Sequence, residues 1–237
     1  MALGHSPKIV TDGLVLALDA FNIKSFKNTT TWFDLSGRNN HATMFGSVPV
    51  TTDGGASFDF STVTGINAPN ASLGFTFASD MIPTTGSFTL SCWIKNPNST
   101  GQIGLFSNSG AGNGYRFGIA SGGIYWLIGP TYAEGSINFK SSLNTELWYN
   151  VICVFDRSGT FHAGTPYIDL YLNGVFQNSG LPNATQTAFT SVAPGLVKSA
   201  CCTLYKGKLS QFSAYSRALS ADEIKQNFNA LRGRYGL

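Results

Sequence analysis

The sequence predicts an all-β fold, a two-sheet antiparallel sandwich that ends in one short α-helix. The 237 residues include 27 Gly and 18 Phe, and only 11% are charged, whereas charged residues make up about 25% of an average soluble domain. Short apolar or alternating runs recur along the chain with turn residues between them, which is typical of sandwiches. No helical periodicity appears before residue 220. We therefore expect about nine to twelve strands in a single domain that spans residues 1–237.

Nine segments carry these runs, and Gly, Pro, Asn, Asp or Ser residues separate them. In chain order they are GLVLALDA (13–20), SFDFS (57–61), SFTLSCWIKN (87–96), QIGLFSN (102–108), YRFGIA (115–120), GIYWLIG (123–129), WYNVICVFD (148–156), YIDLYLNGVF (167–176) and GKLSQFSAYS (207–216). Within YLNGVF, Asn173 and Gly174 lie between apolar flanks, a pattern that predicts a hairpin with a type I′ turn.

The helix is predicted over about 220–231. Ser220 and Glu223 have the spacing of a capping box, which marks a helix start. The residues that form one apolar face of this helix are Ile224, Phe228 and Leu231. We expect this face to dock against the sandwich or a neighbouring subunit, because so short a helix is marginal alone. Gly233 is expected to end the helix.

The four cysteines indicate packing rather than metal binding. Cys92 and Cys153 share strand parity with apolar neighbours, so both are expected to be small buried hydrophobes. Cys201 and Cys202 would point to opposite faces of a strand. No Cys-x-x-Cys spacing is present, which argues against zinc. Free thiols fit assembly in a reducing cytoplasm, and a Cys92–Cys153 bridge stays open as an alternative.

Charge and hydropathy argue against nucleic-acid binding and against a membrane-spanning segment. The net charge of +3 is spread along the chain, whereas a nucleic-acid binder needs a clustered basic face, so we expect no nucleic-acid partner. No apolar run approaches the roughly 18 residues that a bilayer span requires, so we expect no membrane insertion. The N-terminus lacks the basic region and cleavage site of a secretory signal peptide.

Six phrases together resemble the concanavalin A-like lectin/laminin G-like jelly-roll family over nearly the whole chain. They are VTDGLVLALDAFNIKSF, TTWFDLSGRNNHAT, GSFTLSCWIK, LWYNVICVFD, DLYLNGV and YSRALSADEIKQNFNALRGRYGL. The opening and closing phrases are similar to a subgroup found in virion proteins of tailed phages, particularly large marine phages. The resemblance implies two twisted antiparallel sheets, one of them concave, with the chain ends close together.

The resemblance implies a non-enzymatic virion structural protein, displayed on the particle surface as a head decoration or tail appendage. Its partners would then be other virion proteins or further copies in a homo-oligomer, assembled in the host cytoplasm. The first alternative is a carbohydrate-binding, lectin-like module that contacts host-surface glycans. The second is a degenerate glycoside hydrolase. A hydrolase needs paired carboxylates, and the three glutamates (Glu134, Glu146 and Glu223) stand apart in the sequence, so we expect no catalytic residue.

A glycan site would need an exposed aromatic ring, because sugar rings stack on flat aromatic faces. Tyr125 and Trp126 point to opposite faces of one predicted strand, so one of them is a candidate for a binding groove. Tyr115, Arg116 and Tyr132 lie in flanking segments and complete the candidate site. A position in the core or at the rim is the simpler interpretation of these aromatics.

The stretch TTWFDLSGRNNHATMF (30–45) is the candidate for a metal site. Asp34 and Asn39 offer side-chain oxygens that calcium prefers. The stretch contains only one carboxylate, and the simpler interpretation is that Asp34 closes an Asx turn and Gly37 permits the bend. Apart from calcium in this loop, the sequence indicates no cofactor.

Overall fold

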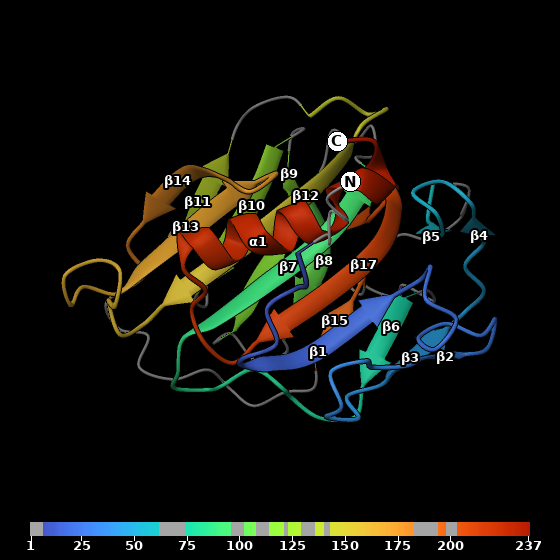
Figure 1. Ribbon diagram of the computed structural model, residues 1–237, viewed down its shortest axis with the longest axis horizontal. Coiled ribbons are helices and arrows are strands. Elements are labelled where there is room, and N and C mark those ends of the chain that lie inside the picture. Colours follow the sequence, from blue (N-terminus) through green and yellow to red (C-terminus); the bar gives the residue numbers. More distant parts are fainter. Residues whose placement is uncertain are drawn as a thin grey trace, which may run out of the picture.

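Two sheets face each other in the structure of this chain (Figure 1). The computed structural model describes residues 7–61, 74–95, 102–107, 114–120, 123–128, 136–139, 143–182, 194–197 and 203–237. The first sheet has the order β14-β13-β12-β7-β17-β5-β4, and β1 also pairs with β17. Its strands are β1 (Leu14–Asp19), β4 (Val50–Thr51), β5 (Ser57–Asp59), β7 (Phe88–Lys95), β12 (Trp148–Asp156), β13 (Tyr167–Leu172), β14 (Val175–Gly180) and β17 (Lys208–Tyr215).

The second sheet has the order β11-β10-β9-β8-β15-β6-β3-β2, and β16 joins β8 in the one parallel pairing among the described strands. Its strands are β2 (Thr31–Trp32), β3 (Ala42–Phe45), β6 (Gly74–Phe77), β8 (Gln102–Ser107), β9 (Tyr115–Ala120), β10 (Gly123–Ile128), β11 (Ser136–Phe139), β15 (Gly195–Leu196) and β16 (Thr203–Leu204). The predicted antiparallel sandwich is confirmed, and all nine predicted runs form strands. The expected number of strands was too low, because short strands of two to four residues give no periodic signal.

Aromatic rings fill the space between the sheets. The Trp32 ring centre lies 4.7 Å from that of Phe58, and Phe58 lies 4.9 Å from Phe75. Cys92 and Cys153 are buried in the same core as free thiols, as their strand parity predicted. Burial raises the pKa of both thiols above the ordinary value, so they stay protonated and act as small apolar side chains.

The predicted hairpin turn is confirmed at the β13–β14 connection. Asn173 and Gly174 have φ values of 50° and 74°, the positive values that a type I′ turn requires at both central positions.

The helix α1 (Ala221–Leu231) lies across the outer face of the first sheet (Figure 1). The Ser220 side chain caps it, and the capping box with Glu223 is complete. Ile224 is fully buried against β12 and β17 residues, which confirms docking against the sandwich. Phe228 and Leu231 are only half-buried. No helix among the described residues is long and apolar enough to cross a membrane.

α1 ends at Leu231, as predicted, but Gly233 does not have the left-handed conformation of a helix-ending glycine. The chain continues as a 3-10 turn, η1 (Arg232–Tyr235), and the left-handed residue is Gly236, with φ of 75°. This extra turn brings the Tyr235 ring parallel to Trp93 at 3.9 Å between ring centres. The Trp148 ring centre lies 5.1 Å from that of Tyr235. Trp93 and Trp148 therefore pack against the C-terminal segment.

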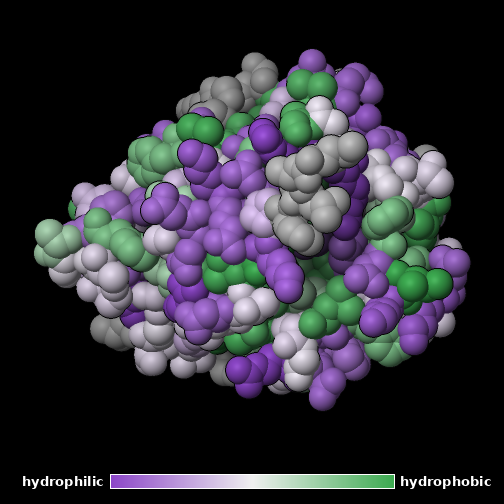
Figure 2. Space-filling model, viewed as in Figure 1, coloured by the Kyte–Doolittle hydropathy of each residue, from purple (hydrophilic) through white to green (hydrophobic). Residues whose placement is uncertain are grey.

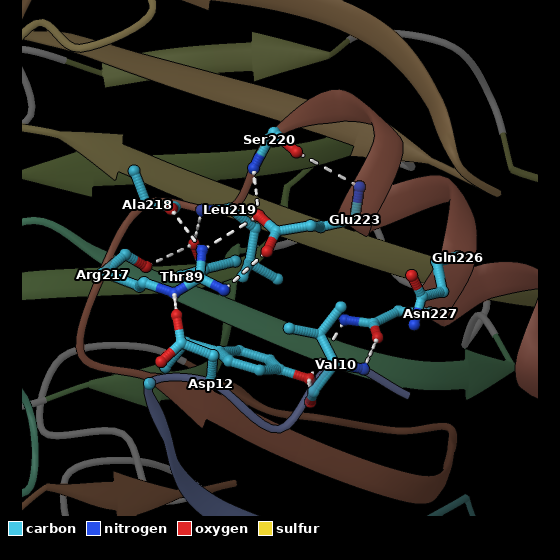
Figure 3. Close-up of polar contacts among 12 residues, drawn as sticks. Val10, Asp12, Thr89, Arg217, Ala218, Leu219, Ser220, Glu223, Gln226 and Asn227 are labelled. Carbon is cyan, nitrogen blue, oxygen red and sulfur yellow. Dashed lines mark hydrogen bonds and ion pairs between the residues drawn. The ribbon is translucent and has the colours of Figure 1, made fainter. Parts of the chain in front are cut away.

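A polar clamp fixes the start of α1 and the first described residues to the first sheet (Figure 3). The Arg217 guanidinium donates to both Glu223 carboxylate oxygens, at 2.6 and 2.9 Å, and its Nε lies 2.8 Å from Asp12 Oδ2. On the next turn of the helix, Asn227 Oδ1 accepts from the backbone N–H of Val10 at 2.8 Å. The beginning of the described chain thus lies beside the C-terminal helix, as the family resemblance implied.

Glu223→Gln is expected to make the protein less sensitive to acid. The hydrogen bond from Arg217 is the main reason why the pKa of Glu223 falls from 4.5 to about 2. A carboxylate with a lowered pKa contributes stability above its unfolded pKa, and this is lost as the pH falls from about 4.5 to about 2. Melting temperatures across this range should therefore fall less steeply for Glu223→Gln. An equal slope in both proteins would contradict the clamp, and Asp222→Asn, an exposed carboxylate of the same helix, is the matched control.

Candidate ligand-binding groove

A groove of about 510 Å³ lies at the edge of the second sheet, where the segment before β2 meets the turn after β3. This volume is within the usual range for a small-molecule site. Nine residues line it: Phe26, Asn28, Thr29, Thr30, Met44, Gly46, Ser47, Val48 and Val50. None of the nine is charged.

The floor of the groove is apolar and its rim is polar. Phe26 and Val48 are buried and Met44 is half-buried. The exposed rim includes the Asn28 amide and the hydroxyls of Thr29, Thr30 and Ser47. The groove therefore offers C–H surface below and neutral hydrogen-bonding groups above.

Backbone contacts between distant segments hold the rim in place. Phe26 bridges to Trp32, and the Met44 N–H donates to the Thr30 carbonyl oxygen at 2.6 Å. Asn28 has a φ of 55°, and Gly46 has a φ of 70° where the chain turns after β3; Asn and Gly tolerate this left-handed region.

Three polar side chains of the rim are free to meet a ligand. Thr29 Oγ1 is used locally, since it contacts the N–H and carbonyl of Thr31. The side chains of Asn28, Thr30 and Ser47 make no hydrogen bond to any residue that the structure describes. An amide and two hydroxyls match a neutral ligand rich in hydroxyl groups.

The sequence-predicted aromatic site is not assembled as an exposed platform. Tyr115 and Trp126 are fully buried among the core side chains between the sheets. Tyr125 lies on the opposite side of β10 from Trp126, as the strand parity predicted, but only 2% of it is exposed. Arg116 is half-buried, and Tyr132 lies outside the described residues.

The Asp34 loop forms the predicted Asx turn. Asp34 Oδ1 accepts from the backbone N–H groups of Ala17 at 2.9 Å and Ser36 at 2.8 Å. Asp34 Oδ2 accepts from the Ser36 hydroxyl at 2.7 Å and from the Asn40 N–H at 3.0 Å. The side chain is buried, and the four donors use the four lone-pair sites of a carboxylate.

Asn39 is exposed, with a φ of 61°, and it is the adjacent Asn40 that contacts Asp34. Calcium binding by Asp34 and Asn39 stays a prediction, and the saturated carboxylate weighs against it. Among the described residues, no group of three His, Cys, Asp or Glu side chains could hold a metal ion.

Two aspartates that are far apart in the sequence come together on the outer face of the first sheet. Val154 pairs with Asp169, and Asp156 pairs with Tyr167, so Asp156 and Asp169 are diagonal neighbours on β12 and β13. Both are buried: Asp156 accepts from the Ser158 hydroxyl and the Phe161 N–H, and Asp169 Oδ2 lies 2.8 Å from His162 Nε2. Burial raises the pKa of Asp169, although His162 opposes the shift. These contacts order the β12–β13 loop, and because both side chains are buried, neither carboxylate is open to a substrate.

A second hollow lies between α1 and the first sheet and is too small for an organic ligand. Its volume is about 10 Å³, which is room for one water molecule. Ser91, Asn150, Ser213 and Asn227 are among its lining residues, and Asn150 Oδ1 is buried with no hydrogen-bond partner among the described residues. This hollow belongs to the docking of the helix.

Comparisons with known proteins agree with the fold. A sequence profile described as the concanavalin A-like lectin/glucanases superfamily matches residues 69–225. The solved binding domain of Paraclostridial Mosquitocidal Protein 1 is similar, with a TM-score of 0.68 and 18% identity over 93% of this chain and 52% of that one. No curated protein matches the chain significantly.

Two structures of the botulinum neurotoxin DC binding domain are also similar. The complex with rat synaptotagmin II has a TM-score of 0.70 and 17% identity, over 94% of this chain and 52% of that one. The complex with SialylT has a TM-score of 0.69 and 18% identity, over 93% and 52%. This chain thus spans about half the length of the solved structures that it matches, and at this level of identity the likeness shows the fold.

Proposed function

Because the chain belongs to the concanavalin A-like lectin/glucanase superfamily, we propose that it is a non-enzymatic, lectin-like domain that binds a neutral glycan. Proteins that share a fold differ in function, so the function is inferred from the site. The observation that carries the proposal is the groove beside β2 and β3, which combines an apolar floor with an uncharged rim of free amide and hydroxyl groups. The similar solved structures are themselves binding domains, which supports this class of function.

The groove matches the two kinds of surface that a sugar presents. The C–H groups of a pyranose ring would pack on Met44 and Val48, and its hydroxyls would exchange hydrogen bonds with Asn28, Thr30 and Ser47. Hydrolysis needs two carboxyl groups beside the glycosidic bond, and the nine lining residues include none. The groove can therefore hold a sugar without cleaving it.

The virion-surface location and the virion proteins as partners stay predictions from the opening and closing phrases of the sequence. Display on a particle surface and glycan binding are compatible with each other. The single-domain organisation over residues 1–237 is part of the same proposal.

Removing free polar groups from the groove rim is expected to weaken glycan binding. Thr30→Val deletes a hydroxyl at nearly constant volume, and Asn28→Gly deletes an amide while keeping the left-handed backbone. Each should weaken binding about tenfold, because one lost hydrogen bond of about 1.4 kcal/mol corresponds to that factor. The affinities would be measured by titration calorimetry, with neutral oligosaccharides selected on a glycan array.

Thr165→Val is the matched control, since Thr165 is exposed in the β12–β13 loop, outside the groove. If no neutral glycan binds, or if Thr30→Val binds as well as the wild type, the groove is not the site. Purified protein should also release no reducing sugar from polysaccharides, and release that persists after removal of contaminating enzymes would overturn the non-enzymatic assignment.

A further inference from the structure

We propose that the loop between β1 and β2, over residues 21–27, docks on the surface of an anionic lipid bilayer. Phe21 and Ile23 would enter the interfacial region, and Lys24 and Lys27 would meet the lipid headgroups. The association is peripheral, and it does not depend on the glycan-binding groove.

The loop exposes two large apolar side chains. Ile23 is 78% exposed, the largest fraction among the large hydrophobic side chains of the described residues, and Phe21 is 57% exposed. In Figure 1, β1 ends right of the centre of the view, and Figure 2 shows hydrophobic and hydrophilic residues side by side on this part of the surface. Burying both side chains against a partner at this tip would therefore be favourable.

Hydrogen bonds hold the loop in this exposed form. The Phe21 N–H donates to Asp19 Oδ1 at 3.0 Å, and the Lys24 N–H donates to Asn22 Oδ1 at 2.9 Å. The Ser25 hydroxyl donates to the carbonyl oxygen of Phe33 at 2.6 Å. The tip is therefore preorganised, and little conformational entropy would be lost on docking.

The charge around the tip is positive. The loop 21–27 carries two basic residues, Lys24 and Lys27, and no acidic residue. Asp19, which precedes the loop, pairs with Arg234 at 2.8 Å, and Asp34 and Arg38 follow it in the sequence. Asp34 is buried and its oxygens are already occupied. Neither Lys24 nor Lys27 forms an ion pair with a described residue, and the Lys27 ammonium lies only over the Phe33 ring, at 5.1 Å from its centre.

An anionic bilayer matches this combination better than a folded protein does. Exposed Ile23 and Phe21, whose ring also lies 4.9 Å from the Arg234 guanidinium, next to lysines without an ion pair are the elements of interfacial membrane binding. In such binding, apolar groups enter the headgroup boundary and cations meet anionic lipids. A protein interface would instead need a broader, flatter contact. The loop continues directly into the groove rim at Asn28.

Ile23→Ser is expected to weaken vesicle binding about tenfold, because the free energy gained by burying the isoleucine side chain corresponds to about a tenfold change in affinity. Full-length protein would be co-sedimented with vesicles of phosphatidylcholine and about 30 mol % phosphatidylserine, and with vesicles of phosphatidylcholine alone. Wild-type protein should bind the anionic vesicles and lose most of this binding at about 0.5 M salt. Lys24→Glu combined with Lys27→Glu should remove the preference for phosphatidylserine.

Val175→Ser is the matched control, since Val175 is 61% exposed on the edge strand β14 and far from the loop in the sheet order. It should bind vesicles like the wild type, and circular dichroism would verify that each variant is folded. Absence of wild-type binding to anionic vesicles, or equal binding by Ile23→Ser, would overturn the proposal and favour a protein partner for the tip. Because these vesicles carry no glycan, Thr30→Val should bind them normally, so the two proposals fail or succeed separately.

Discussion

Asp34→Asn is expected to lower the free energy of unfolding by about 2–3 kcal/mol. An asparagine oxygen can keep the two backbone donors at Oδ1, but its NH2 group would replace Oδ2. The Ser36 hydroxyl can rotate and accept a hydrogen bond instead, whereas the Asn40 N–H can only donate. The buried site would then hold two opposed donors, and an unsatisfied buried donor costs about 1–3 kcal/mol in addition to the lost charge-assisted bonds. Urea unfolding of both proteins would measure the difference.

The same variant tests the calcium hypothesis for this loop. Wild-type melting curves with excess chelator and with millimolar calcium should coincide, because all four lone-pair sites of Asp34 are occupied. Ser36→Ala is the matched control and should cost less, because it removes one donor to Asp34, and the Arg38 N–H that loses the Ser36 hydroxyl as acceptor is exposed to water. A calcium-dependent rise in melting temperature that disappears in Asp34→Asn would show that the loop is an ion site.

Elements specified by neighbouring residues could be predicted from the sequence. The turn at Asn173 and Gly174 depends on two residues that tolerate positive φ. The start of α1 depends on Ser220 and the residue three positions later. Strand parity placed Cys92 correctly because Phe88, Leu90 and Ile94 share its side of β7 and lie in the same core.

Features that depend on pairing between distant segments could not be predicted. The groove exists because the chain around Asn28 and the turn after β3 meet through the bond between Thr30 and Met44. None of its lining residues carries a motif, and β2 is too short for a periodic signal. The alternation of side chains along a strand predicted that Tyr125 and Trp126 point to opposite faces of β10. It could not predict that both would be buried, because burial depends on what covers each face. The bounds of α1 were predicted, but the left-handed glycine is Gly236 and not Gly233, because a 3-10 turn that stacks Tyr235 on Trp93 follows the helix.

The interface beneath α1 is divided into an apolar part and a polar part. Ile224 packs with Ile152, Val154 and Leu219 in one apolar cluster. Next to it, the helix faces Ser91, Asn150 and other polar side chains around the water-sized hollow. Polar contacts of this kind contribute little net stability, because they replace contacts with water. Most of the docking free energy should therefore come from the apolar cluster.

Ile224→Ala is accordingly expected to lower the free energy of unfolding by about 2–5 kcal/mol, the range for truncating a fully buried side chain of this size. Phe228→Ala should lower the free energy of unfolding by less than the about 3–5 kcal/mol expected for a fully buried phenylalanine. Its ring is only half-buried, and its centre lies 5.8 Å from that of Trp93. Lys225→Ala, at an exposed position of the same helix, is the control and should change stability by less than about 0.5 kcal/mol. Urea unfolding would rank the three variants. If Ile224→Ala behaved like Lys225→Ala, the helix would be held by its polar clamp, and Glu223→Gln should then be the more destabilising change at neutral pH.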